Sequence, residues 1–87
     1  MDARARIAWN LRQLRSSLDV TQENLAVDAG VDRTVISDLE RGKHNASIDL
    51  LDRCAKAVKV DASALLAVPD PADPKPEPLK PGRKSNR

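Results

Sequence analysis

The stretch TQENLAVDAGVDRTVISDLERG, from Thr21 to Gly42, decides how the chain folds. Its spacing predicts two short helices joined by a tight turn of about three residues. Gly30 lies at the junction, because glycine takes the left-handed conformation that ends a helix without a steric penalty. Thr21 and Asp32 stand where N-cap residues are expected, since their short side chains accept hydrogen bonds from the free N–H groups at the start of a helix.

The second of these helices has two unlike faces. With its residues placed about 100° apart, Val35, Ile36 and Leu39 fall on one side. The opposite side carries donors, acceptors and one methyl group, in Arg33, Thr34, Ser37, Asp38 and Arg41. Such a helix suits the major groove of DNA, which presents the same kinds of group. An ordinary amphipathic helix with a solvated polar face has the same pattern, so the rest of the chain must separate the two interpretations.

Apolar residues elsewhere predict three further helices, which makes the domain all-α. Residues 2–18 form the first helix, with an apolar stripe of Ile7, Leu11, Leu14 and Leu18. Ser47 and Asp61 are expected to cap a fourth helix and a short fifth helix. The stripe of the fourth helix is predicted to be Ile48, Leu51, Ala55 and Val58. In the fifth helix, one of the adjacent Leu65 and Leu66 cannot face its own core.

Composition excludes several classes of site. The chain has 87 residues with one Cys and one His, which rules out an internal disulfide and a structural zinc site. No nucleophile–base pairing, phosphate-binding loop or metal cluster is present, so we expect no enzyme activity and no cofactor. Cys54 is expected in the core rather than as a redox sensor. Trp9, the single aromatic residue, falls off the apolar stripe and is expected to be half exposed.

The two parts of the chain differ in composition. Residues 1–68 hold ten basic and ten acidic residues, so this domain is formally neutral. Residues 69–87 hold all six prolines, five basic and three acidic residues, which predicts a Pro-rich, basic, largely disordered tail. Such a tail suits contact with phosphates or with a protein partner, and a solvated tail without function fits it equally well. The longest apolar run, 64–68, is too short for a membrane span, so we expect a cytoplasmic protein.

The order and spacing of these residues resemble the helix-turn-helix of the phage lambda and 434 repressor and Cro family, the xenobiotic-response-element-type regulators. The resemblance covers roughly residues 5–67. It is carried by Leu11 to Arg15 (LRQLR), Thr21-Gln22, Leu25-Ala26, Gly30-Val31, Ile36-Ser37, Leu39 to Gly42, Leu51, Ala55 and Val60 to Leu65. It implies a five-helix, lambda-repressor-like domain whose members are mostly dimeric transcriptional regulators. The short length and the run from Asp32 to Ser37 also resemble restriction–modification controller proteins, and antitoxin regulators remain an alternative.

The resemblance also implies which residues contact DNA. The positions that would face the bases are Arg33, Thr34, Ser37 and Asp38. The positions that would contact the DNA backbone are Gln22, Arg41, Lys43 and Asn45. An arginine forks onto guanine, a threonine methyl meets thymine, and a carboxylate accepts from the cytosine amine. Asp32 is left out of the base-reading set, because capping is expected to occupy its carboxylate.

Arg15 and Glu40 match a pair that is ion-paired in that family, which would tie the first helix to the end of the third. Two independently solvated charges are the alternative, since exposed pairs stabilise little. The sequence thus predicts a DNA-binding domain over residues 1–68, with its helix-turn-helix at 21–42, and a tail over 69–87. It would bind a pseudo-palindromic operator as a homodimer and act as a repressor. A protein-interaction module on the same scaffold is the competing class, because the domain is neutral.

Overall fold

The computed structural model describes residues 1–69, and over that range it is all-α. Its helices are α1 (Ala3–Ser17), α2 (Gln22–Ala29), α3 (Arg33–Glu40), α4 (Ile48–Ala57) and α5 (Ala62–Leu66). The predicted five-helix domain is therefore confirmed in this range. The tail prediction lies outside the described residues from position 70 onward.

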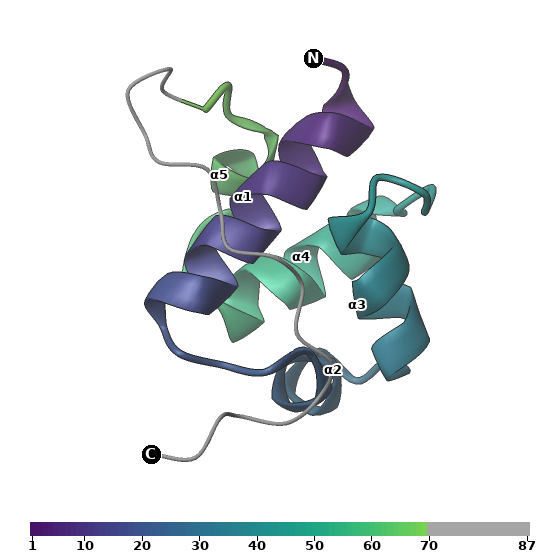
Figure 1. The fold of residues 1–87 in the computed structure, drawn as a ribbon, viewed down its shortest axis with the longest axis vertical. Helices are drawn as coiled ribbons and strands as arrows, with labels where there is room; N and C mark the ends of the chain where they lie inside the picture. The colour runs from purple at the N-terminus through teal and green to yellow at the C-terminus, as the bar shows by residue number, and fades with distance from the viewer. Residues whose placement is uncertain (70–87) are drawn as a thin grey trace.

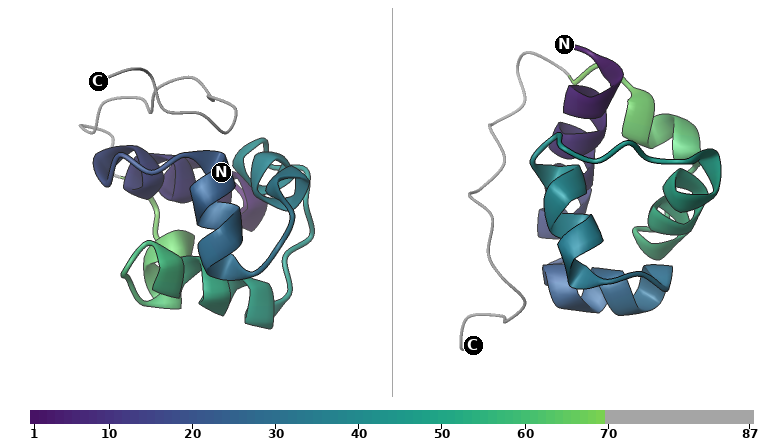
Figure 2. Two further views of the ribbon diagram at one scale, coloured as in Figure 1. Left: turned by 90° about the horizontal axis from the view of Figure 1, so that it is seen from below. Right: turned by 90° about the vertical axis from the view of Figure 1, so that its right-hand side faces the viewer.

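The five helices pack in a closed ring whose order differs from their order in the chain (Figure 1). Helix α1 packs on α3, α3 on α2, α2 on α4 and α4 on α5, and α5 returns to α1. Two further views show the helices surrounding a common centre (Figure 2). Each helix places one side chain with no exposed surface in the core: Leu11, Leu25, Ile36, Ala55 and Leu65. Every helix therefore covers the core from its own side.

Most of the predicted helix ends are confirmed. The side chain of Thr21 accepts from the Asn24 N–H at 3.0 Å. Those of Ser47 and Asp61 cap α4 and α5 in the same way. Gly30 ends α2 in the left-handed conformation, with φ of 72°. These features depend on neighbouring residues alone, which is why the sequence predicts them.

The predicted cap at Asp32 is wrong in its side chain. Asp32 has the extended backbone of an N-cap residue (φ −72°, ψ 149°), but its carboxylate makes no capping hydrogen bond. Its backbone oxygen accepts from the Val35 N–H at 3.0 Å. The exposed carboxylate of Asp32 is thus not occupied in the way that the sequence pattern indicates.

The predicted stripe of α4 is also partly wrong. Ile48 is 82% exposed at the start of the helix, whereas its neighbour Leu50 is buried with Cys54, Ala55 and Val58. Periodicity gives the width of an apolar stripe, but the helices that pack on it decide where the stripe is centred. Here α2 and α5 cover the side that carries Leu50.

Two single residues behave as expected from the sequence. Trp9 is half-buried on α1. Cys54 lies in the core, where burial raises the pKa of its thiol to about 11. The thiol is therefore protonated at neutral pH, which makes it unreactive and favours a packing role over a redox role.

Of the adjacent leucines in α5, Leu65 is buried and Leu66 is exposed, as the sequence requires.

An amide on α1 closes the ring. The side-chain nitrogen of Asn10 donates to the backbone oxygens of Leu65, at 3.0 Å, and Ala67, at 2.8 Å. These oxygens lie at the end of α5, where a helix has no internal donors for its last carbonyl groups. Asn10 thus ties the first helix to the last one. No sequence signal indicated this contact.

The left-handed backbone of Lys59 leads to a prediction about stability. Within residues 1–69, it and Asp19 are the non-glycine residues with positive φ, at 65° and 60°. A left-handed conformation costs a residue with a Cβ about 1–2 kcal/mol, and glycine avoids that cost. We therefore expect Lys59→Gly to raise the free energy of unfolding in urea by about 0.5–1 kcal/mol, after the greater chain entropy of glycine is subtracted.

Lys59→Ala is the matched control, because it removes the same side chain but keeps the Cβ. Its free energy of unfolding should stay within about 0.5 kcal/mol of that of the wild type, as for most exposed substitutions. A Gly variant less stable than the Ala variant would contradict this account of the α4–α5 turn.

Candidate nucleic-acid interface

The C-terminal end of α3 is held by a buried ion pair. Arg15 Nε donates to Glu40 Oε2 at 2.7 Å, and Arg15 Nη2 donates to Glu40 Oε1 at 3.0 Å. The two side chains are 7% and 0% exposed. Arg15 Nη1 also donates to the backbone oxygen of Val20 at 2.9 Å. The pair therefore fixes α3 against α1 and against the segment that leads into α2.

Gln22, the first residue of α2, completes this network. Its side-chain nitrogen donates to Glu40 Oε1 at 3.2 Å, and the residue is 2% exposed. The expectation that Gln22 contacts a DNA phosphate therefore needs correction, since its side chain is committed to the core. The sequence places it at a helix start, where anions are attracted, but does not reveal that Glu40 is the anion it meets.

The exposed face of α3 carries three of the four predicted base-reading residues. Arg33 and Thr34 are exposed and Asp38 is partly exposed. Within residues 1–69, no hydrogen bond or ion pair occupies these three side chains. Ser37 is the exception, at 7% exposed. Both α1 and α2 pack on α3, so they cover more of its circumference than its apolar stripe indicates.

The other residues predicted to contact the DNA backbone directly follow α3 in the chain. Arg41, Lys43 and Asn45 are exposed, at the end of α3 and in the loop that leads to α4. Gly42 turns the chain there with φ of 73°. A Cβ on Gly42 would lie 4.0 Å from the backbone oxygen of Arg4, so this loop runs beside the first turn of α1 (Figure 1).

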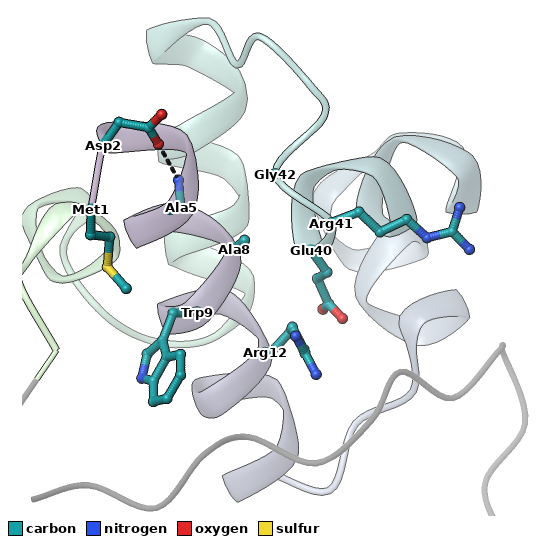
Figure 3. A pocket seen from close by; sticks show the side chains of 9 residues that line it. All are labelled: Met1, Asp2, Ala5, Ala8, Trp9, Arg12, Glu40, Arg41 and Gly42. Carbon is teal, nitrogen blue, oxygen red and sulfur yellow. Dashed lines mark hydrogen bonds between the residues drawn. The ribbon is translucent and has the colours of Figure 1, made fainter. Parts of the chain in front are cut away.

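A shallow groove lies between the N-terminal half of α1 and the end of α3 (Figure 3). Glu40 points from α3 toward α1 in this view, whereas the guanidinium of Arg41 points away from α1. The side chains that line the groove include no nucleophile paired with a base. In the described range, 1–69, no group of three or more side chains is arranged to hold a metal ion.

The exposed charges of α3 and of the residues that flank it cancel. Arg33 and Arg41 are balanced by Asp32 and Asp38. Carboxylates repel phosphate, so this face is better suited to choosing among base edges than to attracting DNA in general.

No helix within residues 1–69 is long and apolar enough to cross a membrane.

The helix-turn-helix family model (HTH_3) matches residues 11–65. A hypothetical transcription factor of Neisseria meningitidis is 38% identical over 68 residues, which are 78% of this chain and 64% of that protein. The chain therefore spans just under two thirds of the length of this relative. Control protein C.BamHI of Bacillus amyloliquefaciens is 42% identical over 57 residues, covering 64% of this chain and 70% of that protein.

Solved structures of such proteins also have a fold similar to that of this chain. The crystal structure of the hypothetical transcription factor NHTF from Neisseria matches with a TM-score of 0.76 at 38% identity, over 78% of each chain. The restriction–modification controller protein C.AhdI from Aeromonas hydrophila matches with a TM-score of 0.69 at 31% identity. That match covers 71% of this chain and 94% of the controller protein.

The buried network yields a stability prediction. Glu40→Gln leaves the Arg15 guanidinium buried without a charged partner, which should lower the free energy of unfolding by about 3 kcal/mol. The double variant Arg15→Met with Glu40→Leu removes both charges and should lose less free energy of unfolding than the sum of the losses of Arg15→Met alone and Glu40→Leu alone. Denaturant unfolding of the two single variants and the double variant measures this coupling.

Asp52→Ala is the control, because it breaks an exposed pair. Lys56 Nζ lies 3.0 Å from Asp52 Oδ2 within α4, with both side chains more than half exposed. Its loss should cost no more than about 0.5 kcal/mol. Equal losses for Glu40→Gln and Asp52→Ala would show that the buried pair has no special role.

Proposed function

The chain belongs to the helix-turn-helix family of DNA-binding transcriptional regulators, as its resemblance to the lambda and 434 repressors predicted, and from this membership we propose how it acts. It binds one duplex DNA sequence with α3 in the major groove and so represses transcription in the cytoplasm. The observation that carries this proposal is the exposed face of α3, whose polar side chains have no partner in the described range. The Arg15–Glu40 pair supports it by holding that helix rigidly.

Three side chains on α3 are proposed to read bases. Arg33 donates two hydrogen bonds to guanine, Thr34 offers its methyl group to thymine, and Asp38 accepts from the amine of cytosine. Ser37 is left out of this set because it is buried. Arg41, Lys43 and Asn45 contact the DNA backbone, which positions the protein without reading sequence. Their exposure at the end of α3 supports this role.

Homodimerisation is proposed from the apolar residues that remain exposed. Ile48, Leu66 and Val68 are large, apolar and exposed, on α4 or at and after the end of α5. A two-fold dimer uses the same surface of both subunits, and each subunit then meets one half of a pseudo-palindrome. The half-sites would lie about one turn of DNA apart. Similarity to two controller proteins makes regulation of a restriction–modification system the proposed setting.

Selection of bound duplexes from a random pool tests the function directly. With the full chain at about 150 mM salt, where non-specific binding is weak, we expect an enriched pseudo-palindrome. No enriched sequence, together with binding that disappears steadily as salt is raised, would contradict the proposal. A protein-interaction module would then be the better interpretation.

Arg33→Ala tests base reading. It should weaken binding to the selected site by about 1–3 kcal/mol and relax the preference at one base pair of each half-site. Arg53→Ala removes an exposed arginine from α4 and serves as the matched control, with little expected effect. A uniform loss over all sequences for Arg33→Ala would exclude a base contact.

Lys43→Ala tests the backbone contact. It should weaken binding to every sequence alike and lower the slope of log K against log salt by about one. Titrations at four or more salt concentrations give that slope, with the exposed Lys59→Ala as control. A changed base preference in Lys43→Ala would mean that this residue reads sequence.

A further inference from the structure

The start of α3 differs from the start of every other helix within residues 1–69. In α1, α2, α4 and α5 the N-cap side chain accepts a hydrogen bond from a backbone N–H, through Asp2, Thr21, Ser47 and Asp61. In α3 the N-cap residue is Asp32, and its side chain makes no such bond. Asp32 is exposed, and within the described range no other donor holds its carboxylate. An acceptor is therefore free at this point.

The position of Asp32 gives that acceptor a use. A recognition helix contacts base edges chiefly with residues at its N-terminal end. Asp32 directly precedes Arg33 and Thr34, which are exposed at that end. Because its backbone is extended, Asp32 lies just before the first turn of α3. The side of that turn that packs on the core carries Val35 and Ile36. It therefore belongs to the exposed end of α3 rather than to its packed side.

The chemistry of a carboxylate narrows the choice of DNA group. An ionised carboxylate accepts hydrogen bonds but donates none, so it is repelled by phosphate oxygens. In the major groove, guanine and thymine present acceptors, whereas cytosine and adenine each present an amine. Adenine carries the N7 acceptor beside its amine, which would face the carboxylate with a like partial charge. Cytosine offers its amine without that neighbour.

We infer that Asp32 is a specificity-determining residue, which accepts from the exocyclic amine of a cytosine in each half-site. This inference rests on the proposed function and adds a base pair to the three read by Arg33, Thr34 and Asp38. The alternative is that the Asp32 side chain is solvated and only stabilises the start of α3 through its negative charge. The two roles differ in whether substitution changes the selected sequence.

Two variants in the random-pool selection separate these roles. Asp32→Asn keeps the shape but adds a donor, and asparagine pairs with the amine and N7 of adenine. We expect it to shift the preference from cytosine to adenine at one base pair of each half-site. Asp32→Ala should reduce the preference at that same pair by about 5-fold or more. The full chain is used for all variants, at the salt concentration chosen for the wild type.

Ser47→Ala is the control, because it removes an N-cap bond that the structure contains, on α4. It should lower the thermal midpoint by about 4–8 °C and leave the selected sequence unchanged. Should Asp32→Ala fail to fold, as judged by circular dichroism, the nearly isosteric Asp32→Asn carries the test alone.

Each outcome decides the question. A changed base at one pair in Asp32→Asn supports the inference. A wild-type sequence that both Asp32 variants also select overturns it and leaves the proposed function intact. A wild-type protein that selects no sequence overturns both, so the two failures are distinguishable.

Discussion

The carboxylate of Glu40 is the group on which the placement of α3 depends. Burying an ion costs several kcal/mol unless it is paired and fully hydrogen-bonded, and Glu40 receives bonds from Arg15 and Gln22. These donors come from α1 and α2, so one carboxylate joins three helices. Replacing such a network with apolar groups is often neutral or stabilising, which makes direction rather than stability its main contribution. A guanidinium fork accepts a carboxylate in few geometries, and α3 is therefore fixed in angle as well as in distance.

The sequence predicts features that depend on adjacent residues and misses those that depend on the packing of distant helices. The cap at Thr21 and the turn at Gly30 need only local chemistry, and both are present. Ile48 was expected in the core but is exposed, because α2 and α5 cover another side of α4. Ser37 and Gln22 are polar and were expected at the surface, but both are buried. A helical wheel states which residues share a side and does not state how many neighbours that side has.

The neutral face of α3 divides the work of the proposed interface between two regions. Carboxylates at Asp32 and Asp38 offset the attraction of the arginines, so this face gains little from phosphate charge alone. General affinity would then come mainly from Lys43, in the loop after α3. Such a protein would dissociate readily from DNA of the wrong sequence, because a carboxylate that faces an acceptor in the groove destabilises the complex. Discrimination is gained at some loss of total affinity.

The bond between Asn10 and the end of α5 has a consequence for how the domain forms. Its acceptors, on Leu65 and Ala67, lie 55 and 57 positions after Asn10, and α1 is synthesised before the other four helices described. On the ribosome, α1 lacks one of its two neighbours until Ala67 has emerged, and ordering so long a loop is entropically costly. Helices α2 and α3 can meet much earlier, since they are joined by a short turn. The nascent chain would therefore hold the helix-turn-helix pair before the ring closes, and closure would come as the last step.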